Sequence, residues 1–165
     1  MNLKILSLVI IGVCILLPDV CYAFLEKDVH LLNMQNGLAD NTVSAVYKDK
    51  EGFVWFGTRN GLSRYDGRQI TNFEQSNSYP SISNLKEVFD GVLAFVDNGV
   101  FSAFDLKKER FLSVVSSSGQ GIPSRGMLQK NDSLVWVISG SELHLMKRCA
   151  SKEGELRLRV QEKYT

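Results

Sequence analysis

A few residues have the types and spacings that chemistry requires, and each pattern is incomplete. Ser83 and Lys86 form S-x-x-K, in which a lysine activates a serine, but the partner motifs of the enzymes that use it are absent. His30 and His144 are too far apart in sequence to have the spacing of metal ligands. His144 alternates with leucines in a predicted strand, which favours a surface position.

The remaining candidates also favour structural roles. Asp49-Lys50-Glu51-Gly52 lacks the alternating oxygen ligands of a calcium loop, so we predict a turn. Cys149 has no His and Asn at a recognisable spacing, and we predict a partly buried structural thiol. The sequence contains neither a phosphate-binding glycine loop nor a serine-hydrolase elbow. We therefore predict no catalytic residue, no metal site, no cofactor and no enzyme activity.

Four residues are the candidates for ligand contact, because loops on a rigid scaffold usually do the binding. They are Arg59, Asn60, Arg64 and Tyr65, with Trp55 added if the edge of a ring of such sheets is open. Sugars favour aromatic faces and forked donors, which these residues would supply. The same positions also belong to a structural repeat, and a scaffold role is the stronger interpretation.

The N-terminus predicts export. Met1–Ala23 begins with Lys4, continues with the apolar run Ile5–Leu17 and ends on Cys21-Tyr22-Ala23, as a signal peptide does. The run is shorter than the roughly 20 residues of a membrane span. An uncleaved anchor and a lipoprotein modified at Cys21 are the alternatives. We expect a periplasmic chain, tethered to a membrane only as part of a longer sensor.

Composition excludes some partners and one source of stability. Among 165 residues, 19 are basic and 18 acidic, which supports neither nucleic-acid nor membrane-surface binding. The basic residues of Lys147–Arg159 are interpreted as a solvated strand or tail. Cys14 and Cys21 leave with the signal peptide, so Cys149 has no partner for an internal disulfide. Stability must come from packing.

The scaffold itself is predicted to be all-β. Short runs rich in Val, Phe, Tyr, Trp and Ile alternate with Gly, Asn and Asp, and no window has a helical period. Asn60-Gly61 is a strong hairpin signal, and Asp49–Gly52 and Asp66-Gly67 are further turns. The predicted strands of one small antiparallel sheet are Thr42–Asp49, Phe53–Thr58, Leu62–Asp66 and Arg68–Phe73.

This sheet is apolar on both faces and needs neighbours, so copies of it are expected. Gly91–Phe111 is a second copy, in which Gly99 matches Gly61, Asp105 matches Asp66 and Phe111 matches Phe73. Ser133–Lys147 is a fainter third copy, with Trp136 opposite Trp55 and Leu143 opposite Leu62; Ser116–Gly126 is predicted to be a loop. A period near forty residues is typical of four-stranded propeller blades.

We therefore predict an all-β partial propeller of about three four-stranded antiparallel blades. The predicted boundaries are a signal peptide at 1–23, a leader strand at 24–36, blade 1 at 37–79, a degenerate blade 2 at 80–118, and a degenerate blade 3 with a C-terminal strand at 119–165.

Residues Asn36–Phe73 closely resemble the two-component regulator propeller repeat. The matching positions are Gly37, Leu38, Asn41, Val43, Asp49, Gly52, Trp55, Gly57, Thr58, Gly61, Leu62, Tyr65, Asp66 and Gly67. The second copy lacks the Trp and the Gly-Thr pair. The third keeps Val135-Trp136 but has Glu142 where the first has Gly61.

The resemblance implies the periplasmic sensor of a hybrid two-component system. In that family, propellers and a β-sandwich precede a membrane helix, a histidine kinase, a receiver and a DNA-binding region, and the ligands are typically oligosaccharides. The implied partners are an oligosaccharide, the remainder of the sensor or its missing blades, and a second copy in a full-length homodimer. Phe24–Leu38 would be the leader strand that completes the last blade.

No kinase motif occurs in the chain, so the resemblance implies a non-catalytic, truncated sensor segment. Two alternatives stay open. One is a polysaccharide-active enzyme on a propeller scaffold, which would need paired carboxylates in a central mouth. The other is a nonfunctional remnant that cannot close its ring.

Overall fold

The computed structural model describes residues 30–74 and 82–165. The predicted signal peptide, and residues 24–29 of the predicted leader strand, lie outside this part of the chain. Every named strand belongs to one compact unit, Leu32–Thr165. Within the described residues, no helix has the length and apolar character needed to cross a membrane.

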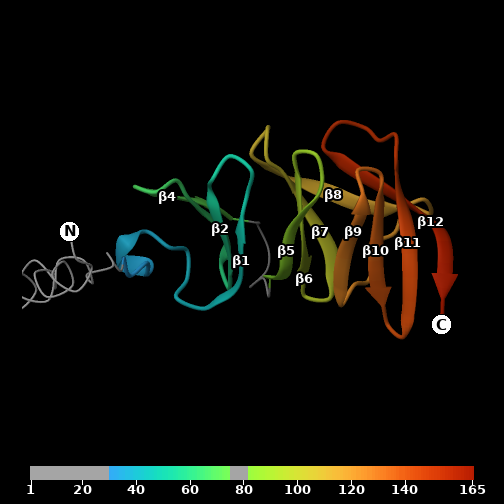
Figure 1. The fold of residues 1–165 in the computed structure, drawn as a ribbon, viewed down its shortest axis with the longest axis horizontal. Coiled ribbons are helices and arrows are strands. Elements are labelled where there is room, and N and C mark those ends of the chain that lie inside the picture. The colour runs from blue at the N-terminus through green and yellow to red at the C-terminus, as the bar shows by residue number, and fades with distance from the viewer. Residues whose placement is uncertain (1–29, 75–81) are drawn as a thin grey trace, which may run out of the picture. The chain divides into compact units, whose positions relative to one another are not determined.

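Blade 1 is a four-stranded antiparallel sheet whose strands follow one another in sequence order (Figure 1). Its turns have the predicted chemistry. Gly61 follows the β2–β3 turn with φ +114°, and the Asp66 carboxylate accepts hydrogen bonds from the backbone N–H of Arg68 and Gln69. The strands are β1 (Val43–Lys48), β2 (Val54–Thr58), β3 (Gly61–Tyr65) and β4 (Ile70–Phe73).

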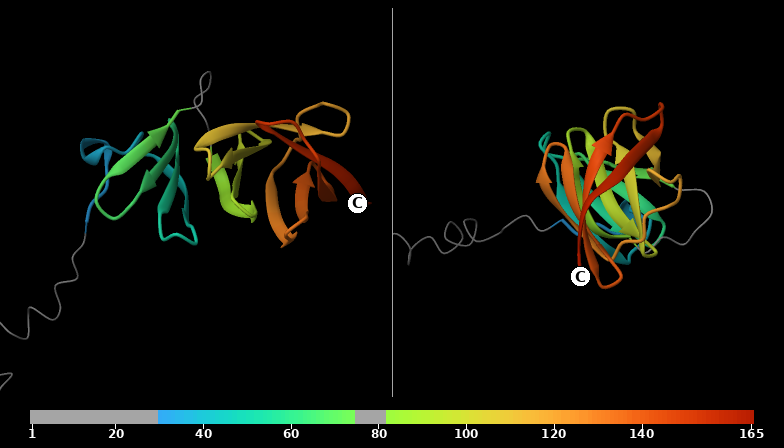
Figure 2. Two further views of the ribbon diagram at one scale, coloured as in Figure 1. Left: turned by 90° about the horizontal axis from the view of Figure 1, so that it is seen from above. Right: turned by 90° about the vertical axis from the view of Figure 1, so that its right-hand side faces the viewer.

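Blades 2 and 3 each repeat this up-and-down order. Blade 2 contains β5 (Ile82–Phe89), β6 (Val92–Asp97), β7 (Val100–Asp105) and β8 (Arg110–Ser116). Blade 3 contains β9 (Gly126–Asn131), β10 (Leu134–Ser139), β11 (Glu142–Cys149) and β12 (Glu155–Tyr164). The prediction of an all-β partial propeller with three four-stranded blades is confirmed, and the blades follow one another in Figure 2.

The blades are less separate than predicted, because blades 2 and 3 form one eight-stranded sheet. The first half of β8, Arg110–Leu112, pairs antiparallel with β7. Its second half, Ser113–Ser116, leaves β7 and pairs parallel with Glu155–Leu158 of β12. Unpaired backbone N–H and C=O groups at a sheet edge favour such pairing. Here the outer strands β8 and β12 supply hydrogen-bond partners for each other's backbone groups. One parallel pair therefore joins otherwise antiparallel blades.

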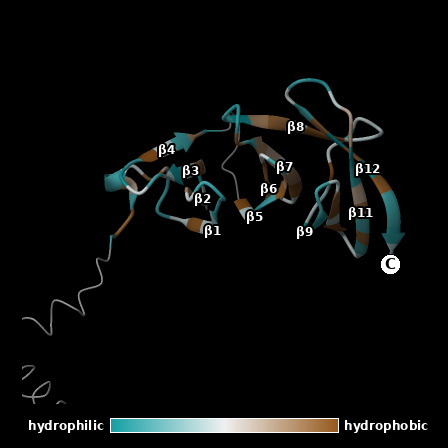
Figure 3. Ribbon diagram, turned by 45° about the horizontal axis from the view of Figure 1, so that its top comes forward, coloured by the Kyte–Doolittle hydropathy of each residue, from teal (hydrophilic) through white to brown (hydrophobic). Residues whose placement is uncertain are grey.

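The hydrophobic core lies between the blades in two clusters. Figure 3 colours the hydrophobic residues of the strands brown. Trp55 and Leu62 of blade 1 pack against Leu93, Phe95 and Phe104 of blade 2. The opposite face of blade 2 packs against blade 3 through residues that include Val92, Ala94, Phe101, Ala103, Val135, Val137, Met146, Leu156 and Leu158. Each blade thus uses a neighbour to bury a face, as the repeat predicted.

Two sequence assignments need correction. Within the predicted leader strand, Met34–Asn36 forms a 3-10 helix, η1, that is capped by Asn33 and Gly37. A leader strand forms only by pairing with a neighbouring sheet edge. Here local capping hydrogen bonds hold Met34–Asn36 in the short helix instead. The match of Phe111 with Phe73 is also wrong. Phe111 pairs with Phe104, whereas Phe73 pairs with Leu62. Asp105 still pairs with Arg110 inside the sheet, whereas the matched Asp66 already lies in the β3–β4 turn, so the register shifts.

Candidate ligand-binding cleft between blades 1 and 2

The β1–β2 turn carries the best-organised polar group of the first blade. Asp49 Oδ1 accepts a 2.9 Å hydrogen bond from the Phe53 backbone N–H, and Oδ2 accepts a 2.7 Å bond from Trp55 Nε1. Gly52 takes φ +96° and closes the turn onto the Asp49 carbonyl. The predicted turn is confirmed. Its carboxylate also fixes the orientation of the buried indole, which the sequence alone did not indicate.

Arg64 lies on the same face of blade 1 as Trp55, since the two residues pair across β2 and β3. Its guanidinium carbon is 4.8 Å from the ring centre of Phe53, 5.6 Å from that of Trp55 and 5.5 Å from that of Phe73. Nη1 is also 2.6 Å from Glu109 of blade 2, and 18% of the side chain is exposed. A planar cation is well suited to this stacked position.

A cleft opens where this face of blade 1 meets blade 2. Its enclosed volume is about 170 Å³, which is smaller than the roughly 300–1,000 Å³ of sites that hold a drug-sized ligand. Blade 1 contributes Asp49, Lys50, Glu51, Phe53, Trp55 and Arg64, and blade 2 contributes Glu87, Asp90, Gly91, Leu106 and Lys107.

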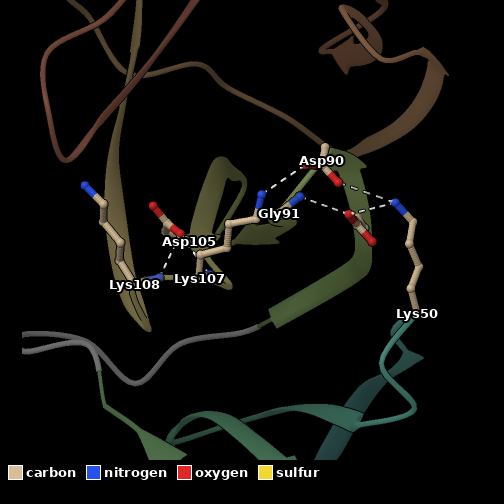
Figure 4. A network of polar contacts seen from close by, with 7 residues as sticks. Lys50, Asp90, Gly91, Asp105, Lys107 and Lys108 are labelled. Carbon is tan, nitrogen blue, oxygen red and sulfur yellow. Dashed lines mark hydrogen bonds and ion pairs between the residues drawn. The ribbon is translucent and has the colours of Figure 1, made fainter.

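Charged side chains from both blades line the cleft and form one network (Figure 4). Lys50 Nζ lies 3.2 Å from Glu87 Oε1 and 3.8 Å from an Asp90 oxygen. Lys107 Nζ lies 3.2 Å from the other Asp90 oxygen. The backbone N–H of Gly91 donates to Glu87 Oε1 at 3.0 Å. Blade 1 and the two turns of blade 2 are therefore linked by ion pairs.

Opposite charges shift two groups in this network. The hydrogen bond and charge of Lys107, with a smaller effect of Lys50, lower the pKa of Asp90. The hydrogen bond and charge of Glu87, with a smaller effect of Asp90, raise the pKa of Lys50. Both shifts favour the charged forms, so Asp90 and Lys50 are both charged at neutral pH. A second hollow, of about 350 Å³, shares Lys50, Glu87 and Asp90.

The predicted ligand residues are not brought together. Arg59 and Asn60 are exposed at the β2–β3 turn, where Asn60 Nδ2 donates to the Ala39 carbonyl at 3.3 Å. Arg64 lines the cleft, but Tyr65 follows it in β3 and points to the opposite face. Trp55 is 1% exposed, so it packs in the core and presents no face to a ligand.

Sequence reasoning missed the blade 2 side of the cleft, including Glu87, Asp90 and Lys107. No motif marks these residues, because the cleft forms where two repeats meet. One signal was available. Asp90-Gly91 precedes the second strand of blade 2, just as Glu51-Gly52 precedes that of blade 1. Equivalent turns of neighbouring blades can be expected at the same end of the stack.

The other candidates from the sequence form no site in the described residues. Ser83 and Lys86 lie in strand β5, as expected for chance S-x-x-K. His144 was predicted at the surface, but its side chain is only 12% exposed and bonds to Glu142 at 2.6 Å. It pairs across the strands with buried Val137, which explains the burial. Cys149 is a partly buried free thiol, and no metal-ligating cluster occurs in residues 30–74 and 82–165.

The comparisons with known proteins agree with the repeat and the fold. The two component regulator propeller model matches residues 37–60, which confirms the resemblance within blade 1. No curated protein matches the chain.

Two solved structures share the fold, and both come from B. thetaiotaomicron. One is the extracellular domain of BT3049, described as a hybrid two component system, with a TM-score of 0.58 and 18% identity over 83% of this chain. The other is the extracellular domain of BT4673, described as a one component system, with a TM-score of 0.60 and 17% identity over 84% of this chain. This chain covers 18% and 21% of those two structures.

Proposed function

We propose that this chain is the blade-forming segment of an exported sensor that binds an oligosaccharide and catalyses no reaction. The observation that carries the proposal is the match of residues 37–60 to the two component regulator propeller. The likeness of the fold to extracellular domains of regulatory systems supports it. In this proposal the signal peptide directs the chain to the periplasm, and the remainder of a longer sensor passes the signal on.

The cleft between blades 1 and 2 is the proposed ligand site. It combines the partly buried ring of Phe53 with cations and carboxylates on both walls. A sugar ring offers an apolar face to an aromatic ring and hydroxyl groups that both donate and accept hydrogen bonds. Because Lys50, Asp90 and Lys107 are all exposed, their ion pairs can exchange for bonds to hydroxyl groups at small cost.

The carboxylates of the cleft support binding rather than glycoside hydrolysis. A glycosidase needs one carboxylic acid whose pKa is raised, so that it can donate a proton. Asp90 has a lowered pKa. Asp49 and Glu87 each accept a backbone hydrogen bond, from Phe53 and Gly91 respectively.

Thermal unfolding of the full chain with a panel of oligosaccharides tests the proposal. A ligand should raise Tm in a saturable way, and at 100 times Kd the stabilisation should reach about 2.7 kcal/mol. Lys107→Ala should weaken binding. Lys108→Ala is the matched control, because Lys108 pairs with Glu153 and does not line the cleft.

Three results would contradict the proposal. The first is the absence of a shift with every sugar. The second is an equal loss of binding affinity in Lys107→Ala and Lys108→Ala, which would indicate that the ligand binds outside the cleft. The third is turnover of a polysaccharide panel by the chain, which would support the enzyme alternative. A chain that shows no cooperative unfolding would instead support the remnant alternative.

A further inference from the structure

The second hollow adjoins the cleft and is lined by all three blades. It shares Lys50, Glu87 and Asp90 with the cleft. It also has walls that the cleft lacks, among them Tyr47 of β1 and Gln129 of β9. Strand β5 contacts both β1 and β9, so the first strands of the three blades lie side by side there. We call this space the three-blade hollow.

The two spaces differ in size. The cleft encloses about 170 Å³, and the three-blade hollow encloses about 350 Å³. Only the hollow lies within the roughly 300–1,000 Å³ of sites that hold a drug-sized ligand. An oligosaccharide has at least two linked rings, so the cleft alone offers a small share of the space that such a ligand needs. The adjoining hollow supplies the larger share.

Blade 1 contributes one aromatic ring to each space. Phe53 lines the cleft, and Tyr47 lines the three-blade hollow. Both side chains are partly exposed, and both pack against the core cluster between blades 1 and 2. Tyr47 pairs with Trp55 across β1 and β2, so it lies on the face of blade 1 that meets blade 2. Because a sugar ring stacks its apolar face on an aromatic ring, two consecutive sugar rings would each have a stacking partner.

The three-blade hollow also has polar groups that are free to bind. Lys86 is exposed in β5, Gln129 is partly exposed in β9, and Asp132 is exposed in the turn after β9. Within residues 30–74 and 82–165, these three side chains form no hydrogen bond or ion pair. An ammonium group, an amide and a carboxylate together supply the donors and acceptors that hydroxyl groups require. The lysines of the cleft, by contrast, must first leave their ion pairs.

We propose that a single oligosaccharide spans both spaces, with one sugar ring against Phe53 and the next against Tyr47. Lys50 would lie beside the linkage, since it lines the cleft and the three-blade hollow. The inference rests on the proposed function and deepens it. It adds a second subsite in which blade 3 takes part through Gln129, so the ligand contacts all three blades.

Calorimetric titration of the full chain with sugars of increasing length tests the inference. The probes are xylo-, cello-, arabino- and galacto-oligosaccharides of one to four units. One molecule should bind per chain, and affinity should rise by about tenfold or more from the monosaccharide to the longer members of a series. The rise is expected because linked rings occupy both spaces at once.

Substitutions in each space test whether the same ligand touches both. Lys107 lines only the cleft, and Gln129 lines only the three-blade hollow. Lys107→Ala and Gln129→Ala should each weaken binding of the longer sugar by about three- to tenfold. Gln120→Ala is the matched control, because Gln120 is exposed in the loop before β9 and lines neither space.

Lys86→Ala changes an exposed residue of the hollow and should have the same effect as Gln129→Ala, which guards against a local disturbance of β9. Circular dichroism should show unchanged strand content in every variant.

Several results would overturn the inference and leave a binding function standing. They are weakening by Lys107→Ala alone, weakening by the hollow substitutions alone, two molecules bound per chain, and an affinity that does not depend on length. The absence of binding in all four series would contradict the proposed function itself, and this inference with it.

Discussion

The indole N–H of Trp55 donates a 2.7 Å hydrogen bond to the carboxylate of Asp49, and both residues are buried. The bond joins the β1–β2 turn to the aromatic residue that packs blade 1 on blade 2. Turn geometry and packing between the blades are thus connected through one side-chain pair.

Substitution at Asp49 should destabilise blade 1. The carboxylate of Asp49 uses two acceptor oxygens, whereas the amide of Asn has one oxygen and one NH2 group. In Asp49→Asn, either the Phe53 N–H or Trp55 Nε1 would therefore face the NH2 group, which is a donor. We expect a loss of about 1–3 kcal/mol in the free energy of unfolding. Trp55→Phe removes the indole donor, and a double-mutant cycle in urea should give a coupling of about 0.5–3 kcal/mol. Additive effects would contradict the link.

Gly57 should not tolerate a side chain. A Cβ built there would lie 3.0 Å from Ile82 Cβ and 3.3 Å from Ala45 Cβ, where blade 1 meets blade 2. Gly57→Ala should cost roughly 1–3 kcal/mol through overpacking, measured by chemical unfolding. Gly121→Ala is the control, because the nearest atom to its Cβ would be 3.9 Å away and its φ is not positive. Equal effects of the two substitutions would contradict this account.

Arg64→Lys should be destabilising although it keeps the charge. The guanidinium is stacked among Phe53, Trp55 and Phe73, and an ammonium cannot reproduce its planar contacts. We expect a loss of about 0.5–2 kcal/mol in thermal unfolding. Lys108→Arg, made at an exposed ion pair, should be neutral. Full stability of Arg64→Lys would show that the stacking contributes little.

The ion network should make stability depend on acid pH. The pKa of Asp90 is lowered in the folded chain, so its contribution is present above the ordinary Asp value of about 3.9 and is lost as pH falls through the folded value. Lys107→Ala should move the pKa of Asp90 upward, because Lys107 is its principal partner. Carboxyl titration by NMR measures this shift, and an unchanged pKa would contradict the assignment.

Much of blade 1 could be predicted because its signals are local. Asn60-Gly61 and Asp66-Gly67 specify reversals within a few residues, and apolar runs between them give the strands. Blade 2 was harder because its Asp105 pairs inside the sheet, whereas the matched Asp66 of blade 1 lies in a turn. The pairing of β8 with β12 brings together segments about forty residues apart, and no local pattern encodes it.

The cleft could be predicted only in part for the same reason. Arg64 was identified from the repeat, whereas Glu87 and Asp90 become meaningful only once blade 2 packs against blade 1. Trp55 was considered both as a packing anchor and as a ligand contact, and its burial by Phe104 supports packing.

The divided strand β8 gives the two junctions of the stack different mechanical properties. Separating blade 3 from blade 2 would break backbone hydrogen bonds, among them the 2.9 Å bond from the Ser113 N–H to the Gly154 carbonyl. Blade 1 meets blade 2 through side chains such as Lys50 and Glu87. We therefore expect blade 1 to separate from blade 2 under a smaller force than is needed to part blades 2 and 3.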